Sequence, residues 1–387
     1  MKFNRIFLIV LDSLGVGAAR DADKFGDGNA NTLKHIIEKC NTNMPYLTKL
    51  GMLNILNNED EKCYAYYTKG LPISNGKDTL TGHLEMMGIK TEVPFKTFTE
   101  KGFPKELIQE LELEFDRKII GNCSESGTEI INRLGEEHIK TGSVIVYTSA
   151  DSVLQIAAHE SVIPLSELYR LCEIARKITT KPEWKVGRVI ARPFTGNKGN
   201  FTRTANRHDY ALDPKGKTIL DSLKEHKYDV ISIGKISDVF NNNGITRATK
   251  TSDNLDGIKR IIETERTYFK GLCFANLNDF DSKYGHRRDP LGYSKCIEQF
   301  DSFLPEIITN LKDEDLLIIT ADHGNDPTYE GTDHTRENVP VIIFNKKFTE
   351  PTCLDYLTTF ADIGSTIADN FNVEQTDIGK SFLSKLK

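Results

Sequence analysis

Short apolar runs rich in β-branched residues constrain the fold of this chain more than any other feature. Each run is bounded by polar or turn-forming residues, as buried strands are. The runs are IFLIVL (6–11), VIVYTS (144–149), DVISIG (229–234), GLCFANL (271–277), DLLIIT (315–320) and VPVIIF (339–344). Continuous apolar runs of this kind are typical of parallel strands that are buried on both faces.

Patterns with helical periodicity separate these runs. They include NTLKHIIEK, KTILDSLKEH, NLDGIKRIIETE, YSKCIEQFDSFLPEIITNL and FADIGSTIADNF. Strands that alternate with helices predict an α/β fold, in which helices cover both faces of a mainly parallel sheet.

The middle of the chain has a different character. It holds the helical patterns PKELIQELELEF and LSELYRLCEIARKI, and its basic polar content rises through GRVIARPF and GNFTRTANRHDY. With 387 residues the chain is too long for one ordinary core. We therefore predict an inserted α+β cap domain at residues 94–216, within a discontinuous core domain made of residues 1–93 and 217–387.

Charge and cysteine content limit the classes of function. A net charge of −6 argues against general attraction to nucleic acids or membranes, but it is compatible with a local basic pocket for a phosphate ester. The seven cysteines form no CxxC pair, as in a reduced chain. The run at 6–11 is too short for an export signal or a bilayer span. We therefore expect a cytoplasmic protein without nucleic-acid or membrane partners, and a monomer, since no sequence feature demands a partner chain.

Three aspartates close apolar runs. Asp12 ends FLIVLD, Asp322 ends LLIITAD, and Asp281 lies shortly after GLCFANL. Ligands bind at the carboxyl ends of strands in open α/β sheets, so we expect the three carboxylates to converge at one sheet edge. Aspartate is also a common residue at strand ends, so each one alone is compatible with a structural role.

Histidines near these aspartates favour a metal site. His323 follows Asp322 directly, His286 follows Asp281 by five residues, and His334 lies in GTDHTRE. Oxygen and imidazole ligands without thiolate suit Mn²⁺, Mg²⁺ or Zn²⁺. Six side chains exceed what one catalytic ion with open positions requires, so we predict two ions that share them, as in phosphoryl transfer.

The polar turn GKDTLTGH, residues 76–83, raises the question of what Thr79 does. It departs from a P-loop because the gap from Gly70 to Gly76 is one residue too long and Asp78 separates Lys77 from Thr79. We interpret Thr79 as a nucleophile whose hydroxyl a divalent cation activates. The alternative is a structural role as the N-cap of the helix that follows.

Segments in all parts of the chain together resemble the phosphopentomutase family of the alkaline-phosphatase-like superfamily. They are VLDSLGVG, GKDTLTGH, YTSADSVLQIAAHE, RTANRHDYAL, DFDSKYGHRRDP, TADHGNDP and GTDHTRE. They occur in order and include the inserted domain, whereas the metal-site segments alone indicate only the superfamily. The resemblance implies an alkaline-phosphatase-like core, and an isomerase that interconverts ribose or deoxyribose 1-phosphate and 5-phosphate through a 1,5-bisphosphate.

The resemblance also implies roles for single residues. Two Mn²⁺ ions, with Mg²⁺ or Zn²⁺ as alternatives, would be held by Asp12, Asp322 and His323, and by Asp281, His286 and His334. Thr79 would face the first ion and become phosphorylated, and a hexose or pentose bisphosphate would charge it. The small-molecule sugar phosphate would be contacted by Asp151, Arg188, Arg203 and Lys235.

Three alternatives stay open. The first is another enzyme of the same superfamily: a metal-dependent phosphatase, a phosphodiesterase or a cofactor-independent phosphoglycerate mutase. The second is a P-loop kinase or NTPase, which the spacing disfavours. The third is a non-catalytic binding protein with structural metals, which is disfavoured because structural sites usually close their coordination shell.

Overall fold

The structure, a computed structural model, describes residues 2–59, 61–149 and 152–387. The chain forms two compact units. The first unit comprises residues Met1–Pro94 and Pro214–Lys387, and the second comprises Phe95–Asp213. Each unit has its own sheet and its own buried core.

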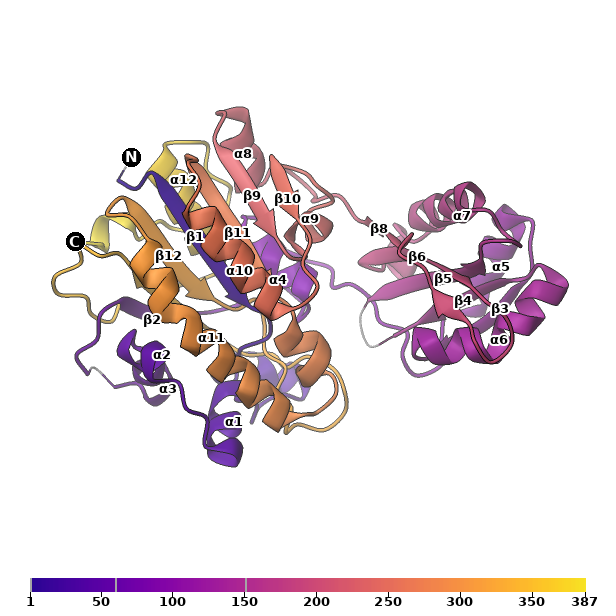
Figure 1. The fold of residues 1–387 in the computed structure, drawn as a ribbon, viewed down its shortest axis with the longest axis horizontal. Coiled ribbons are helices and arrows are strands. Elements are labelled where there is room, and N and C mark those ends of the chain that lie inside the picture. Colours follow the sequence, from indigo (N-terminus) through magenta and orange to yellow (C-terminus); the bar gives the residue numbers. More distant parts are fainter. Residues whose placement is uncertain (1, 60, 150–151) are drawn as a thin grey trace. The chain divides into compact units, whose positions relative to one another are not determined.

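The first unit is built on a seven-stranded sheet with the order β10-β9-β11-β1-β12-β13-β2 (Figure 1). Its strands are β1 (Arg5–Leu11), β2 (Tyr66–Gly70), β9 (Asp229–Ile233), β10 (Arg247–Thr249), β11 (Gly271–Leu277), β12 (Asp315–Thr320) and β13 (Val339–Phe344). Strand β13 is antiparallel to both of its neighbours, and the other paired strands are parallel. The sheet is thus mainly parallel, as predicted.

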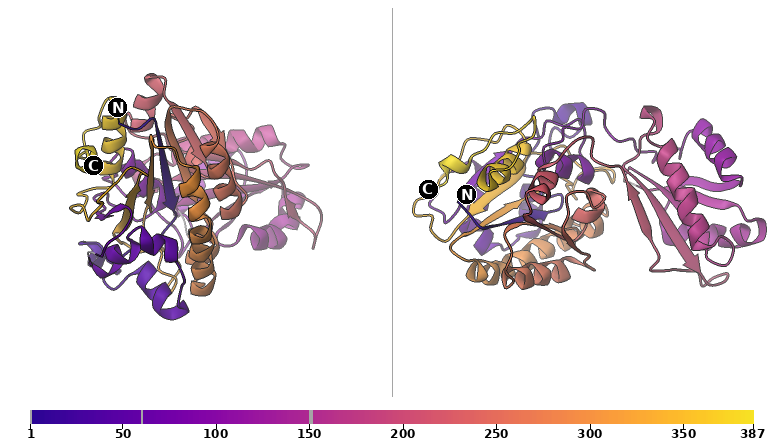
Figure 2. Two further views of the ribbon diagram at one scale, coloured as in Figure 1. Left: turned by 60° about the vertical axis from the view of Figure 1, so that its left-hand side comes forward. Right: turned by 90° about the horizontal axis from the view of Figure 1, so that it is seen from above.

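Helices cover both faces of this sheet (Figures 1 and 2). On one face α10 and α1 pack against α11, and on the other α12 packs against α8 and α4. The helices of this unit are α1 (Thr32–Cys40), α2 (Pro45–Lys49), α3 (Met52–Asn57), α4 (Thr79–Met86), α8 (Ile219–Glu225), α9 (Ile236–Val239), α10 (Asn254–Glu265), α11 (Pro290–Asn310) and α12 (Ala361–Phe371). The interior strands β1, β11 and β12 are buried along their whole length, which is why they read as unbroken apolar runs.

The second unit has a mixed sheet with the order β3-β4-β5-β6-β7, to which β8 adds by pairing with β6. Its strands are β3 (Ile119–Ser124), β4 (Val144–Thr148), β5 (Val153–His159), β6 (Arg188–Thr195), β7 (Thr202–Arg203) and β8 (His208–Ala211). Helix α6 (Gly127–Thr141) packs on one face and helices α5 (Lys105–Phe115) and α7 (Leu165–Ile178) pack on the other. A role of this unit in substrate binding stays a prediction.

The two ends of the second unit lie beside the same short segment. Near the start, the Lys96 amide donates to the Lys185 carbonyl at 2.8 Å. Near the end, the Leu212 amide donates to the Gly187 carbonyl at 3.2 Å. The chain therefore begins and ends this unit at residues that are bound to positions 185–187.

Within the described part of the chain, no helix combines the length and apolar character that a bilayer crossing requires.

Candidate metal centre

Three adjacent strands deliver the three aspartates to one sheet edge. Strands β11, β1 and β12 are neighbours and parallel, so their carboxyl ends lie side by side. Asp12 directly follows β1, and Asp322 lies two residues beyond β12. Asp281 stands in a π-helical turn, Phe280–Gly285, that follows β11. All three side chains are buried.

The structure brings the six predicted ligands together as two triads. Within each triad, one ligand atom from each residue lies within 4.8 Å of the others, and the triads are Asp12, Asp322 and His323, and Asp281, His286 and His334. The imidazoles of His323 and His334 join the triads, because their ring centroids are 4.2 Å apart. The six side chains thus form one continuous cluster, although their role as metal ligands stays a prediction.

Backbone carbonyls orient two of the imidazoles. His286 Nδ1 donates to the Thr332 carbonyl at 2.6 Å, and His323 Nδ1 lies 3.0 Å from the Gly324 carbonyl. A hydrogen on Nδ1 leaves the Nε2 lone pair for another partner. His286 Nε2 lies 3.2 Å from Asp281 Oδ2, and His323 Nε2 lies 3.3 Å from Asp322 Oδ2. Each Nε2 therefore faces a carboxylate of its own triad, as ligands of a shared cation would.

Thr79 is the first residue of helix α4, and its hydroxyl contacts the triad of Asp12. Thr79 Oγ1 lies 3.2 Å from His323 Nε2 and accepts a hydrogen bond from Lys235 Nζ at 3.1 Å. Asp78 is the N-cap, since its side chain accepts from the Thr81 amide at 3.1 Å. The reading of Thr79 as a helix cap is therefore wrong, and its hydroxyl points to the cluster instead.

The four predicted substrate contacts are placed differently. Lys235 lies at the metal centre, with Nζ 2.8 Å from Asp12 Oδ2 and 2.7 Å from Asn278 Oδ1. Arg188 on β6 is 3.4 Å from Asp209, and Arg203 on β7 donates to Thr128 Oγ1 at 2.6 Å. Both arginines belong to the second unit. Asp151 lies outside the described residues.

Electrostatics at the centre favour positive charge. Burial acts to lower the pKa of His323, but Asp322 and the other carboxylates outweigh it and raise that pKa to about 10. Burial also acts to lower the pKa of Lys235. The negative charges of Asp12, Asp281 and Asp322 outweigh this effect, so the pKa of Lys235 is raised. Burial would raise the pKa of Asp281, yet His286 and His334 hold it well below its usual range. A cluster that stabilises protonated neighbours so strongly offers a favourable site for cations.

Unsatisfied ligand atoms show that the cluster fits divalent ions. Asp12 Oδ1, Asp322 Oδ2 and His334 Nε2 are buried and make no hydrogen bond with the part of the chain that the structure describes. Buried polar atoms of this kind are rare without a partner, and carboxylate oxygens with imidazole nitrogens are common ligands of Zn²⁺ and Mn²⁺. Each triad has at least one such atom, so the residues present suit a two-ion site.

Several residues around the triads were missed by sequence reasoning. His83 Nδ1 lies 3.1 Å from Asp322 Oδ2 and 2.9 Å from the Thr79 carbonyl. Asn276 Nδ2 donates to Asp12 Oδ2 at 3.0 Å. The signal for His83 was its spacing, because residues i and i+4 share a helix face and His83 is four residues after Thr79. Asn276 interrupts an apolar strand, and its spacing carries no signal.

The second triad has outer partners of its own. Asn325 Nδ2 donates to Asp281 Oδ1 at 2.7 Å, and Arg288 donates to the Asn325 side chain in turn. Arg288 also donates to the carbonyls of Gly331 and Asp333, the latter at 2.8 Å. This guanidinium therefore fixes the loop that carries His334. Sequence reasoning missed Arg288, because an arginine in an exposed polar stretch usually reads as a solvated side chain.

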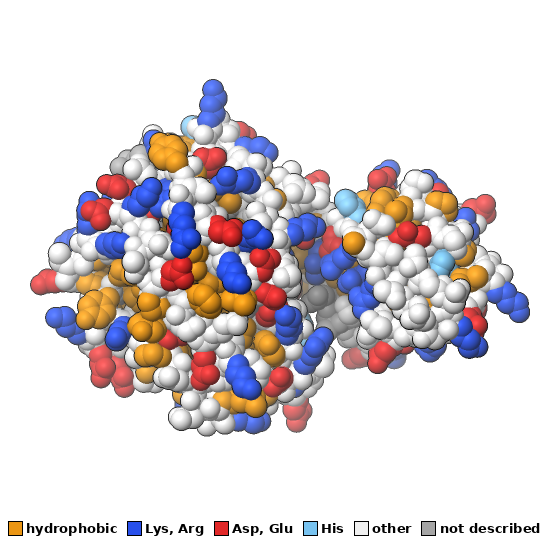
Figure 3. Space-filling model, in the orientation of Figure 1, with side chains coloured by type: hydrophobic (Ala, Val, Ile, Leu, Met, Phe, Trp, Pro, Cys, Tyr) orange, Lys and Arg blue, Asp and Glu red, His pale blue; other side chains and the backbone are white. Residues whose placement is uncertain are grey.

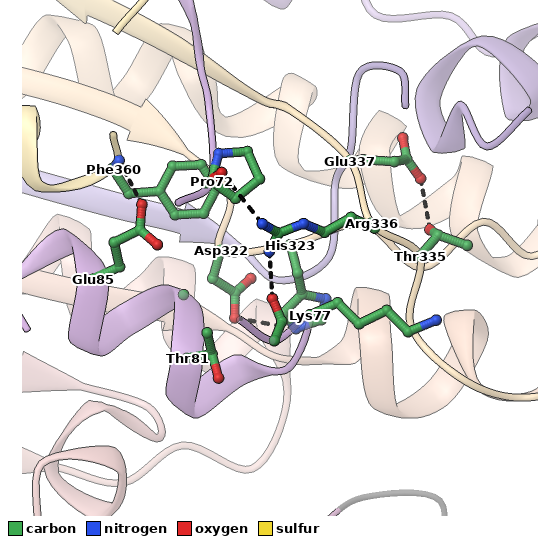
Figure 4. Close-up of a pocket in the computed structure, with 12 residues that line it drawn as sticks. Pro72, Lys77, Thr81, Glu85, Asp322, His323, Thr335, Arg336, Glu337 and Phe360 are labelled. Atoms are coloured by element: carbon green, nitrogen blue, oxygen red, sulfur yellow. Dashed lines mark hydrogen bonds and ion pairs between the residues drawn. The ribbon is translucent and has the colours of Figure 1, made fainter. Parts of the chain in front are cut away.

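Asp322 and His323 line a pocket together with the buried charged side chains of Glu85, Arg336 and Glu337 (Figure 4). Arg336 donates to the carbonyls of Gly76 at 2.6 Å and Pro72 at 3.3 Å, so it fixes the turn that leads into α4. Glu85, from the far end of α4, accepts from the Ser74 amide at 2.7 Å and the Phe360 amide at 3.0 Å. These bonds hold both ends of the segment that positions Thr79.

Comparison with known proteins identifies a family. The model of the metalloenzyme superfamily matches residues 4–375. A solved protein from Pyrococcus horikoshii is 14% identical, with a TM-score of 0.50 over 98% of this chain and 100% of that one. Phosphoglycerate mutase of Leishmania mexicana is 13% identical, with a TM-score of 0.48 over 98% of this chain and 97% of that one. The fold is accordingly an alkaline-phosphatase-like α/β fold.

Proposed function

The chain belongs to the metalloenzyme superfamily, and from this premise we propose that it is a phosphopentomutase, an isomerase that interconverts the 1-phosphates and 5-phosphates of ribose and deoxyribose. Membership of this superfamily implies the use of divalent metal ions. The observation that carries the proposal is the position of Thr79 Oγ1, within 3.2 Å of His323 Nε2 and 3.1 Å of Lys235 Nζ. An alcohol beside a cation and a set of metal-ligating side chains is arranged to attack phosphorus.

The two triads would hold the ions, one with Asp12, Asp322 and His323 and the other with Asp281, His286 and His334. We propose Mn²⁺ for both, since the family resemblance implies it. When bound, such ions neutralise the phosphoryl oxygens and lower the pKa of a coordinated hydroxyl. We further propose that a hexose or pentose bisphosphate delivers the first phosphoryl group to Thr79.

Thr79 carries the phosphoryl group between the two half-reactions as phosphothreonine. The free hydroxyl of a sugar monophosphate attacks that phosphorus, the P–Oγ bond breaks, and the hydroxyl proton ends on Thr79. The product is the 1,5-bisphosphate. After the bisphosphate has turned around, Thr79 Oγ1 attacks the other phosphorus and returns its proton to the departing sugar oxygen. Lys235 donates to Thr79 Oγ1 and so stabilises the negative charge that develops there in both directions.

The sugar phosphate is the proposed partner of a monomeric chain. Arg188 and Arg203 suit it, because the planar guanidinium presents two parallel donors to a phosphate. Asp151 is the proposed contact for a sugar hydroxyl. Lys235, which lies beside Thr79, is proposed to contact the transferring phosphoryl group itself.

The test is to incubate Mn²⁺-loaded protein, primed with glucose 1,6-bisphosphate, with ribose 1-phosphate. Ribose 5-phosphate as the product supports the mutase. Inorganic phosphate without ribose 5-phosphate indicates a phosphatase, and interconversion of phosphoglycerates in a parallel sample indicates a phosphoglycerate mutase. ATP turnover that persists in Thr79→Ala indicates a kinase, and full activity after chelation refutes the use of metal.

A further inference from the structure

Lys235 is partly buried, unlike the lysines that stand on the surface of the first unit. Figure 3 shows such surface Lys and Arg side chains mixed with Asp and Glu side chains. The side chain of Lys235 is only 20% exposed. Its Nζ lies 2.8 Å from Asp12 Oδ2, 2.7 Å from Asn278 Oδ1 and 3.1 Å from Thr79 Oγ1. An ammonium group has three hydrogens to donate, so these three acceptors use all of them.

A glycine at the end of β9 allows this approach. Gly234 has a φ of 80°, and a Cβ atom there would lie 2.4 Å from the carbonyl oxygen of Asn276. Glycine tolerates both the left-handed backbone and this close contact, whereas a residue with a Cβ atom does not. Strands β9 and β11 are parallel neighbours, so Lys235 leaves β9 beside Asn278, the residue that follows β11.

The side-chain amide of Asn278 is held in one orientation. Its Nδ2 donates to Ser282 Oγ at 2.9 Å, and the Ser282 hydroxyl donates to the Asn278 carbonyl, also at 2.9 Å. A hydroxyl that already donates its only hydrogen can act toward Nδ2 only as an acceptor. The amide nitrogen therefore faces Ser282, and Oδ1 is left to accept from Lys235. The distance of 2.7 Å to Lys235 Nζ is at the short end of the usual range, as expected for a charged donor.

The two anchors of Lys235 differ in what else they would do. Asp12 is a proposed ligand of the first ion, and a bound cation would draw on the negative charge that attracts Lys235 Nζ. Asn278 belongs to neither triad, and its amide is neutral. It can therefore hold the ammonium without adding a fourth carboxylate to the centre. Such an anchor matters because the long side chain of lysine has many rotamers to lose when it is fixed in one place.

We propose that Asn278 is a positioning residue, which holds Lys235 Nζ against Thr79 Oγ1 through the hydrogen bond to its Oδ1. Asn278 acts through the ammonium group, which the proposed mechanism uses to stabilise negative charge on Thr79 Oγ1. This inference deepens the proposed function and rests on it for the reaction that is affected. The hold on Lys235 can be tested apart from that reaction.

The first test measures how firmly Lys235 is held in the Mn²⁺-loaded chain without substrate. Reductive methylation with formaldehyde and cyanoborohydride, followed by peptide mass spectrometry, gives the labelling rate of each lysine. We expect Asn278→Leu to label Lys235 about tenfold faster than wild type does, because a hydrogen bond to a charged group is lost. Asn278→Asp keeps an acceptor at this position and should restore slow labelling.

The matched control for this test is Asn338→Leu. Asn338 is also a half-buried asparagine of the first unit, it immediately precedes β13, and its Nδ2 donates to the Ala18 carbonyl at 3.1 Å. Its replacement removes an amide of the same kind at a place where Lys235 is not bound. The labelling rate of Lys235 should stay at the wild-type value.

The second test measures the rate at which glucose 1,6-bisphosphate phosphorylates Thr79 in a single turnover. We expect Asn278→Leu to slow this step about tenfold, less than the hundredfold or more that loss of an oxyanion donor costs, because Lys235 is loosened and not removed. In a Lys235→Met background, Asn278→Leu should slow the step no further, since residues that act as one unit are not additive. Elemental analysis of each variant separates this effect from the loss of an ion.

Three results would overturn the proposal: an unchanged labelling rate of Lys235 in Asn278→Leu, an unchanged rate of Thr79 phosphorylation in that variant, or slowing of equal size with and without Lys235. The last result would assign Asn278 a structural role. If the wild-type chain does not phosphorylate Thr79, the proposed function fails, and the labelling rate alone then decides whether Asn278 holds Lys235.

Discussion

His83 Nδ1 lies 3.1 Å from Asp322 Oδ2 in an interior where both side chains are 0% exposed. The other ring nitrogen, Nε2, lies 3.4 Å from Asn276 Nδ2, which donates to Asp12 Oδ2 at 3.0 Å. The two carboxylates of the first triad are therefore linked from behind by one imidazole and one amide. Partners of this kind fix the orientation of metal ligands and strengthen metal binding.

We expect His83→Gln to weaken the binding of one ion about tenfold to a hundredfold, since this is the usual effect of removing an outer partner of a ligand. The triad of Asp281 has different outer partners, so its ion should be retained. Elemental analysis after dialysis against a series of free Mn²⁺ concentrations measures the affinity of the chain for each of the two ions. His226→Gln, at a half-exposed histidine on the C-cap of α8, is the matched control. Retention of both ions with wild-type affinity would show that His83 does not support the triad.

On the proposed function, Thr79→Ala should abolish mutase turnover and leave the fold intact. The change removes hydrogen bonds to Lys235 and His323, which costs about 1 kcal/mol, while the helix keeps its N-cap at Asp78. Intact-protein mass spectrometry after exposure to glucose 1,6-bisphosphate should find a phosphoryl group on wild type and on Thr81→Ala, but none on Thr79→Ala. Fragmentation locates the group. Wild-type turnover in Thr79→Ala would end the nucleophile assignment.

Arg288→Lys should loosen the loop that carries His334. Lysine keeps the positive charge but lacks the planar fork that reaches Asn325, Gly331 and Asp333 together. We expect faster amide exchange at residues 331–335 and weaker binding of the ion at Asp281. Hydrogen-exchange mass spectrometry and metal analysis measure these effects. Arg287→Lys, at the exposed neighbouring position, is the control. Equal exchange in both variants would contradict the role of Arg288.

Glu265 on α10 is expected to make stability fall as pH rises. Burial raises its pKa from 4.5 to about 8, with Asn310 and Arg5 opposing only in part. Between these values the folded chain keeps a proton that the unfolded chain has released, so the free energy of unfolding decreases by up to about 1.4 kcal/mol per pH unit. Glu265→Gln mimics the protonated form and should gain stability over wild type across this range.

Urea unfolding at a series of pH values checks this difference between Glu265→Gln and wild type. Glu263→Gln, at an exposed position on the same helix, is the control and should keep the wild-type dependence. A difference between Glu265→Gln and wild type that does not grow with pH would show that Glu265 is ionised in the folded chain.

The convergence of the aspartates could be predicted because topology alone produces it. Asp12, Asp281 and Asp322 each follow a run that a sequence scan reads as a buried parallel strand, and parallel neighbours end at the same edge. The runs at 271–277, 315–320 and 339–344 coincide with β11, β12 and β13. The antiparallel direction of β13 was not predicted, because an apolar run carries no information about strand direction.

The residues that support the centre could not be predicted, because their partners are distant in sequence. Asn276 contacts a carboxylate 264 positions away, and His83 contacts one that is much later in the chain. Tyr147 was read simply as part of a buried strand, and only the three-dimensional arrangement shows that its hydroxyl makes no hydrogen bond with the described residues. A residue that acts through a second side chain leaves no spacing pattern, whereas helix and strand periodicities reflect local geometry.

The hydrogen bonds of Lys96 and Leu212 to residues 185 and 187 bring both ends of the second unit to one short stretch of backbone. The second unit is a single continuous piece of sequence. It can therefore be lengthened, shortened or exchanged without reordering the strands that carry the aspartates. On the proposed function, a new insert alone would change which sugar phosphate the protein binds and would leave the candidate metal centre unchanged.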